Sequence, residues 1–332
     1  MDALEQLVFI LTYPFRYPTL GGERVYWLYL VWALVIAAGV YLVRQRRGGP
    51  ANDGPENGRG GLLGFWFPKR IFAHASALVD YKYFFVNRIL FPAFLAPFVV
   101  GTAAVSAWTA GLLEAAMGPQ TVPLPLGMTG GLLLTALAVL AMDAGIFIAH
   151  TLQHKVPLLW EFHKVHHSAE VLTPITVYRM HPVDDLLTGT VVGLLTGMVY
   201  GVFAYVCGGD PAPFTVLELN VVLFAFYVLG YNLRHSHIWL PYPAALSHVL
   251  VSPAQHQIHH SKAPKHFDKN MGFIFAFWDY LAGTLYVPRA YERLDFGLDR
   301  DEHHEFTGVW RLYTLPFRKA AALLFAGRRE RV

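Results

Sequence analysis

The residues of this chain that could carry chemistry are its histidines, because 13 of the 16 lie between His150 and His266. Eight of them form one HxxxH pattern and two HxxHH patterns: His150 and His154; His163, His166 and His167; and His256, His259 and His260. Side chains at positions i, i+3 and i+4 share one face of a helix, so each pattern can direct two or three imidazoles at one point. Imidazole binds iron, zinc, copper and nickel, and several converging imidazoles predict a metal site.

The number of imidazoles indicates more than one ion. A zinc site typically takes about four ligands, so eight imidazoles predict two metal ions. The place of these histidines in the chain supports a metal site. His150 and His154 end a long apolar run, and Pro157 stops that helix, so the next histidine group can fold back beneath the first. The alternative for any single histidine is that it lies at the membrane interface and forms its hydrogen bonds with lipid headgroups or backbone carbonyls. Three spaced groups on one side of a membrane favour metal binding.

The composition is typical of a membrane protein. Hydrophobic residues make up 55% of the 332 residues and charged residues 15%, with a mean hydropathy of +0.37. Soluble domains carry about 25% charged residues. The net charge is +3, but the basic residues occur in short clusters beside apolar runs, so we expect no nucleic-acid binding. Cys207 is the only cysteine, which excludes an internal disulfide framework and a thiolate metal cluster.

Five apolar runs approach the roughly 20 helical residues that cross a bilayer. They are Val25–Val43, Ile89–Leu113, Thr129–Ala149, Leu186–Val206 and Phe214–Tyr231. Segment 44–88 holds eight Lys and Arg residues, whereas 114–128 and 207–213 hold none. By the positive-inside rule the N-terminus lies outside, and both histidine-rich regions lie in the cytoplasm. We therefore expect a multi-pass membrane protein with its active site facing the cytoplasm.

The three histidine patterns, in this order and with two spans between the second and third, resemble those of the sterol desaturase and fatty-acid hydroxylase superfamily. The resemblance covers about Phe67 to Val287 and is tightest at LLWEFHKVHHS, YRMHP, SPAQHQIHHS and NMGFIFAFWDYLAGTLY. It implies an all-α integral membrane fold, with a four-helix transmembrane core under a cytoplasmic histidine-rich helical cap. The first apolar run would be an additional N-terminal span.

We expect three parts along the chain. Residues 1–64 are predicted to hold the N-terminal membrane anchor span and a flexible cytoplasmic linker, GGPANDGPENGRGG. Residues 65–290 are predicted to form the histidine-box membrane oxygenase domain. Residues 291–332 are predicted to form a cytoplasmic C-terminal tail.

The resemblance implies a non-haem di-iron centre bound by the eight patterned histidines and by His235 of NLRHSH. It places His181 of YRMHP at the edge of the site, and Asp143 and Asn270 where they would hold an imidazole by a hydrogen bond. The sequence departs from the family at Thr151, where Arg often follows the first histidine, and at His237, where Asn is common. For His237 a hydrogen-bond donor or a polar filler is favoured over a ligand. The histidines expected not to bind metal are His74, His248, His266, His303 and His304.

The patterns and the resemblance predict an O2-dependent oxidoreductase that acts on a membrane lipid, such as a fatty acyl chain or a sterol. Hydroxylation is favoured, and desaturation is the alternative because it differs by small geometric shifts. Iron is expected since the reaction needs a redox metal, and zinc can substitute for it in an imidazole cluster.

Electrons must come from outside the chain. It has no haem-attachment CxxCH, no GxGxxG with a Rossmann pattern and no cysteine iron–sulfur motif. The resemblance implies a ferredoxin or a small b-type cytochrome with its reductase as the electron donor. The basic segments 44–88 and 262–269 are the expected docking surfaces.

Two rival functions stay open. A histidine-rich metal transporter or sensor would need ionisable residues through its spans. Asp143 is nearly alone there, which weighs against transport. A non-catalytic relative that keeps zinc structurally is the second rival, and the retention of all eight patterned histidines weighs against it.

Overall fold

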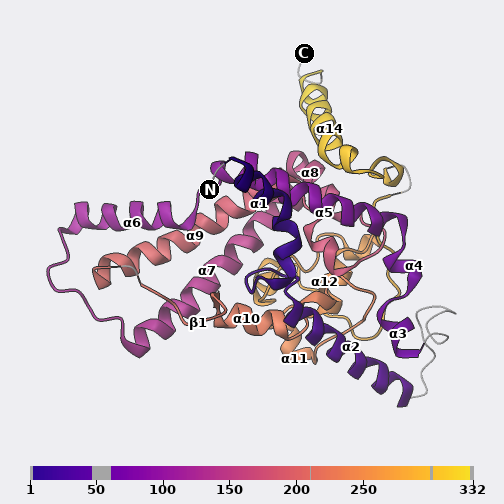
Figure 1. Ribbon diagram of the computed structural model, residues 1–332, viewed down its shortest axis with the longest axis horizontal. Helices are drawn as coiled ribbons and strands as arrows, with labels where there is room; N and C mark the ends of the chain where they lie inside the picture. The colour runs from indigo at the N-terminus through magenta and orange to yellow at the C-terminus, as the bar shows by residue number, and fades with distance from the viewer. Residues whose placement is uncertain (1–2, 47–60, 210, 300–301, 330–332) are drawn as a thin grey trace.

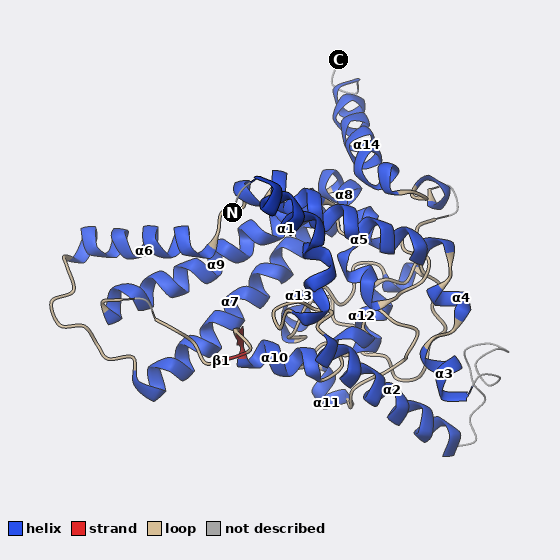
Figure 2. Cartoon of the chain, viewed as in Figure 1, coloured by secondary structure: helices blue, strands red, loops and turns tan. Residues whose placement is uncertain are grey.

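The computed structural model describes residues 3–46, 61–209, 211–299 and 302–329, and these are almost entirely helical (Figures 1 and 2). The strands in this described part are β1 (Thr215–Val216) and β2 (Leu219–Asn220), which pair antiparallel. Helices α6, α7 and α9 extend together toward one side of the molecule, and the short helices α3, α4, α11 and α12 gather on the other (Figure 1). The prediction of a helical protein is confirmed.

Three helices in the described ranges are long and apolar enough to cross a membrane. They are α2 (Trp27–Arg46), α7 (Gly127–Lys155) and α9 (Pro182–Cys207). They correspond to the first, third and fourth predicted spans.

Helix α9 packs against both α7 and α6 (Thr102–Met117). Its glycines make the contact with α6 close: a Cβ at Gly197 would lie 2.5 Å from Cβ of Val105, and one at Gly201 would lie 2.5 Å from Cβ of Thr109. Small residues at a spacing of four let helix backbones approach in this way.

The other two predicted spans are wrong as continuous helices. The second, Ile89–Leu113, is divided between the end of α5 (Ala75–Phe94), the 3-10 turn η2 (Ala96–Phe98) and α6. Pro97, which lacks an amide hydrogen, and the extended Gly101 before α6 interrupt the helix.

The fifth predicted span, Phe214–Tyr231, contains the β1–β2 hairpin and the eight-residue helix α10 (Val221–Val228). Leu217 and Glu218 take positive φ angles of 49° and 65° at the hairpin turn, which a helix does not allow. The segment is held to α7 through Thr135, whose Oγ1 accepts from Phe214 N and whose carbonyl accepts from Asn220 Nδ2.

Short helices and 3-10 turns make up much of the remaining described chain. They are α3 (Gly61–Trp66), α4 (Lys69–Phe72), α8 (Pro157–His167), η3 (Pro174–Tyr178), η4 (Tyr231–Leu233), α11 (Ala244–Ser247), α12 (Pro253–His259), η5 (Pro264–His266), α13 (Phe277–Ala282) and η6 (His303–Glu305). Two capping boxes begin η3 and α12, at Thr173 and Ser252, and fix where these elements start.

The two ends of the chain pack on this body. Helix α1 (Ala3–Arg16) lies on α5 and leads into η1 (Tyr17–Thr19), and α2 lies against α3, α10 and η4. At the other end α14 (Val309–Arg329) packs on α8 and then projects away (Figure 1). The division into three parts stays a prediction, and the predicted flexible linker falls almost wholly on residues 47–60, outside the described residues.

Candidate metal centre

The first two histidine patterns meet because α7 ends where α8 begins. Val156 takes an extended conformation (φ −94°, ψ 112°) between the two helices, and Pro157 occupies the first turn of α8, where its missing amide hydrogen costs nothing. The chain therefore reverses, as expected from Pro157. Helix α12 brings the third pattern to the same place.

Nine imidazoles gather in two groups, and they are the nine predicted ligands. The first histidine group is His150, His154, His163, His167 and His259; the second histidine group is His166, His235, His256 and His260. Within each group the nitrogen atoms that could bind a metal lie within 4.8 Å of one another.

Both HxxHH patterns are divided between the groups. His163 and His167 are one turn apart on α8 and join the first group, while His166 is rotated by about 100° from His167 and joins the second. On α12 the division is reversed, with His259 in the first group and His256 and His260 in the second.

The nitrogen atoms of these rings fit metal binding. Nε2 of His154, His167 and His259 is buried and has no hydrogen-bond partner. In the second group the Nε2 atoms of His235, His256 and His260 lie 3.1–3.2 Å from one another. Three imidazole nitrogens facing one another cannot all be satisfied by hydrogen bonds among themselves, whereas a cation between them would use the lone pair of each ring nitrogen that carries no proton.

The protonation state also fits. Burial lowers the pKa of His166 to about 3 and holds the pKa of six further rings well below the usual value; these are His163, His167, His235, His256, His259 and His260. Neutral imidazole is the form that binds a metal, so these rings are ready for it at neutral pH.

Backbone carbonyls orient two rings of the first group. Nδ1 of His150 donates to the carbonyl of Met271 at 2.8 Å, and Nδ1 of His259 donates to that of Lys269 at 2.8 Å. A proton on Nδ1 leaves the Nε2 lone pair directed into the group.

Two carboxylates face the same group: Oδ2 of Asp184 lies 3.4 Å from Nδ1 of His163, and Oδ1 of Asp268 lies 3.6 Å from Nδ1 of His154. Sequence reasoning missed these partners. The acidic pair in HPVDD, at the start of an apolar helix, was the available signal for Asp184.

The second group has a cationic neighbour, Arg234. Its Nη2 donates to Nδ1 of His256 at 3.0 Å and to the carbonyl of Gly272 at 3.2 Å, and its Nη1 donates to the carbonyl of Phe273 at 2.7 Å. The rings of Phe226, Tyr231 and Phe273 surround the guanidinium, with centroids 5.5–5.7 Å from Cζ. Burial lowers the pKa of Arg234 to about 10, so it remains charged at neutral pH.

Asp143 and Asn270 bind mainly backbone groups, and no imidazole is among the hydrogen-bond partners that the structure gives them. Asp143 is fully buried and accepts from Ile274 N, Phe275 N and Trp278 Nε1. Asn270 donates to the carbonyls of Gln255 and Tyr286 and accepts from Tyr286 N. The predicted hydrogen bond to a ring is wrong for both. Both residues instead hold segment 269–275, whose carbonyls orient His150 and His259.

His181 and His237 belong to neither group. His181 caps α9, its Nδ1 accepting from Val183 N, and its ring contacts Phe162 and Phe317. Its neighbour Met180, and not His181, lines the cavity beside the histidines. Nε2 of His237 donates to the carbonyl of Phe65 at 2.7 Å.

Of the histidines expected not to bind metal, His74, His248, His266 and His304 also lie outside both groups. The side chain of His303 is outside the described residues.

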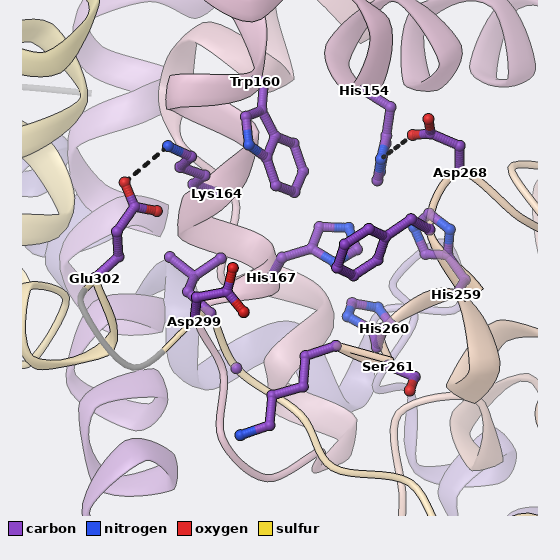
Figure 3. A pocket seen from close by; sticks show the side chains of 14 residues that line it. His154, Trp160, Lys164, His167, His259, His260, Ser261, Asp268, Asp299 and Glu302 are labelled. Atoms are coloured by element: carbon purple, nitrogen blue, oxygen red, sulfur yellow. Dashed lines mark hydrogen bonds and ion pairs between the residues drawn. The ribbon is translucent and has the colours of Figure 1, made fainter. Parts of the chain in front are cut away.

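The nine imidazoles lie between two cavities. A cavity of about 350 Å³, here called the cap cavity, is lined by four of them and by Trp160 and charged side chains (Figure 3). Its lining includes His154, His167, His259, His260, Lys164, Lys262, Asp268, Asp299 and Glu302.

The other cavity measures about 120 Å³ and is here called the inner cavity. It is lined by His150, His163, His166, His235 and His256, by the apolar side chains of Ile146, Val177, Met180 and Phe273, and by Arg24 and Arg234. Each imidazole therefore lines one cavity or the other.

The comparisons agree with this geometry. A family model described as fatty acid hydroxylase matches residues 135–284, which contain all nine imidazoles. This region is thus similar to the sterol desaturase and fatty-acid hydroxylase superfamily. The N-terminal helices α1 and α2 and the C-terminal helix α14 lie outside the part matched to the superfamily.

Several curated proteins are similar to this chain over about half of its length. The ornithine lipid hydroxylase OlsE of Rhizobium tropici is 29% identical over 49% of this chain and 44% of its own length. The alkylglycerol monooxygenase of Danio rerio is 26% identical over 49% of this chain and 32% of its own length. The very-long-chain aldehyde decarbonylase GL1-9 of Oryza sativa subsp. indica is 30% identical over 44% of this chain and 52% of its own length. The matches thus span about half or less of each relative, and no solved structure matches the chain.

Proposed function

We propose that this protein is a membrane oxidoreductase that binds two iron ions in the two histidine groups and uses O2 to hydroxylate a lipid. The observation that carries the proposal is the gathering of nine imidazoles, seven of them buried, in two groups between two cavities. Iron bound there would supply the redox chemistry with O2 that zinc cannot.

The chain's own residues would orient the metal-binding imidazoles and bind the lipid. Carbonyls of segment 269–271 would fix ring orientation in the first group, where the carboxylates of Asp184 and Asp268 lie close to two further rings. Arg234 would orient His256 in the second group. The inner cavity, small and partly apolar, would hold the part of the lipid to be oxidised and exclude bulk water from it.

The substrate class rests on the relatives' names. They include hydroxylases or monooxygenases of an ornithine lipid, alkylglycerol and sphinganine, together with a sterol desaturase. Their common feature is a lipid. We propose a membrane lipid such as a fatty acyl chain or a sterol as the substrate, and hydroxylation ahead of desaturation.

In place of a four-helix core beside an N-terminal span, we propose that α2, α6, α7 and α9 form the membrane region. Residues 211–228 would return along α7 through the hairpin and α10. Its contacts with Thr135 support this path, because backbone groups at membrane depth need partners within the protein. The basic segment 44–88 supports a cytoplasmic position for the histidine groups.

For the electron donor we propose a ferredoxin or a small b-type cytochrome that docks near the cap cavity. Lys262 lines this cavity, and the nearby Lys265 pairs with Glu292. The double reversal Lys262→Glu and Lys265→Glu should lower turnover at limiting carrier while iron content stays unchanged. Unchanged turnover under these conditions would exclude docking at this surface.

Metal content tests the proposal first. Protein from iron-supplemented cells should hold about two irons per chain. His167→Ala, in the first group, and His260→Ala, in the second, should each reduce this sharply, whereas His248→Ala, in neither group, should not. A product search by lipidomics would then follow. Iron content that is negligible in the wild type, or indifferent to both substitutions, would refute the di-iron oxidoreductase.

A further inference from the structure

Arg24 lines the inner cavity although it lies far outside the part of the chain matched to the superfamily. It belongs to the loop between η1 and α2. Two hydrogen bonds fix this loop without using the Arg24 side chain: Nδ2 of Asn232 donates to the carbonyl of Arg24 at 2.9 Å, and the Tyr29 hydroxyl donates to the carbonyl of Gly21 at 2.7 Å. The N-terminal segment thus completes the cavity next to the imidazoles.

The guanidinium of Arg24 has donors to spare. It hydrogen-bonds to Tyr227, and its Cζ lies 5.7 Å from the centroid of Phe273. Among the described residues no carboxylate forms an ion pair with it: Asp185, which also lines the cavity, pairs with Arg88 at 3.1 Å, and Glu23 accepts a hydrogen bond from the Tyr178 hydroxyl at 3.3 Å. A guanidinium offers five N–H donors, so most of those of Arg24 remain for a ligand.

The second arginine of this cavity already has partners for several of its donors. Arg234 already donates to two carbonyls and to His256. Arg24 is therefore the cation of the inner cavity that can bind a ligand without giving up contacts within the fold. A charge-assisted hydrogen bond from arginine to an oxygen is among the stronger polar contacts that a site can make.

We propose that Arg24 binds the oxygen-bearing end of the lipid substrate. This inference rests on the proposed function and deepens it. The ligand class is a long-chain lipid with a carboxylate or another accepting oxygen at one end. Arg24 and five imidazoles line one cavity of only about 120 Å³. The carbon presented to the histidine groups therefore lies within a few bonds of that oxygen, and oxidation occurs near the polar end of the chain.

Binding of radiolabelled hexadecanoate to immobilised, iron-loaded protein in detergent tests this, with hexadecan-1-ol and hexadecane as unlabelled competitors. The wild type should bind hexadecanoate and should be competed by the alcohol, which accepts a hydrogen bond, more strongly than by the alkane. Arg24→Gln should weaken hexadecanoate binding by about tenfold or more, as expected for the loss of a charge-assisted hydrogen bond. Arg24→Lys, which keeps the charge but not the planar fork, should fall between the two.

Two controls separate the outcomes. Arg16→Gln, at an exposed residue that lies over Phe9, should bind hexadecanoate like the wild type. Iron content and the unfolding temperature of each unliganded variant report whether the centre and the fold survive. Equal hexadecanoate binding by Arg24→Gln and wild type, or equal competition by alcohol and alkane, would overturn the role of Arg24. If the wild type still holds iron in that case, the proposed function stands. Iron-free wild type would instead be a failure of the proposed function.

Discussion

The guanidinium of Arg234 donates a hydrogen bond to Nδ1 of His256 at 3.0 Å, so a permanent cation orients one of the rings of the second histidine group. The same guanidinium binds the carbonyls of Gly272 and Phe273, next to Met271, whose carbonyl orients His150 in the first group. Arg234 therefore connects both histidine groups through one buried side chain.

Arg234→Ala should lower both stability and metal content. It leaves two buried carbonyls and an imidazole nitrogen without a donor, which should reduce the free energy of unfolding by about 3 kcal/mol or more. Thermal unfolding and metal analysis would measure both effects, with Arg16→Ala as the exposed control. Arg234→Lys should recover only part of the lost stability and metal content, because an ammonium cannot reproduce the planar fork of donors on a guanidinium. An Arg234→Ala protein with wild-type stability and two irons would contradict this role.

Asp143→Ala should disturb the metal centre from a distance. It leaves three donors without an acceptor, one on the buried Ile274 and two on the partly buried Phe275 and Trp278, at a cost of about 3 kcal/mol or more. Segment 269–275 should then loosen and His150 and His259 should lose their orientation, so iron content should fall as well. Asp143→Asn should lose less stability and less iron than Asp143→Ala. The control is Glu114→Gln, at an exposed position on α6. Stability lost without any change in iron content would show that the segment does not support the ligands.

His181 should make stability depend on pH. Burial lowers its pKa to about 4, so the folded protein keeps this ring neutral while the unfolded chain takes up a proton near the ordinary value of about 6.5. Stability is thus full above about pH 6.5 and falls as the pH drops toward 4, by at most about 3 kcal/mol. His181→Asn keeps a capping side chain for α9 and removes the titration. Unfolding temperatures from pH 8 to 4 should fall less steeply in this variant, and parallel curves would refute the assignment.

Gly197→Ala should separate α6 from α9. The new Cβ would lie 2.5 Å from Cβ of Val105 and 2.8 Å from the carbonyl oxygen of Thr102, so the helices must shift, at a cost of about 1–3 kcal/mol. Gly111→Ala is the matched control, since a Cβ there meets nothing within 4 Å and alanine favours the helix. Thermal unfolding in a lipid nanodisc would compare them. The close packing would be excluded if both variants proved equally stable.

The ligands could be predicted from sequence because their arrangement is local. Spacings of three and four residues place imidazoles on one side of a helix wherever the helix lies, and Pro157 marks the reversal between α7 and α8. The partners of these rings could not be predicted in the same way. Asp268 and Asn270 adopt positive φ angles of 56°. The directions of the neighbouring carbonyls, on Lys269 and Met271, depend on contacts with α7 and α12 that only the folded chain creates.

Hydropathy failed where apolar composition conceals a change of backbone. The run Ile89–Leu113 is apolar on both sides of Pro97, and the run Phe214–Tyr231 is apolar on both sides of a hairpin turn. Asp143 was recognised as unusual in an apolar helix, but its partners are two backbone amides and the indole of Trp278, all far along the chain. The contribution of Arg24 to the inner cavity depends on how the N-terminal loop packs on Asn232, which no local pattern encodes.

The division of each HxxHH pattern between the two histidine groups has a thermodynamic consequence. Helices α8 and α12 each carry ligands for both ions, so an ion that orders these helices in one group also places the rings of the other. Binding of the two ions is then energetically linked, and the linkage is reciprocal. Protein given too little iron should consequently divide into fully loaded and empty molecules, with few that hold a single ion.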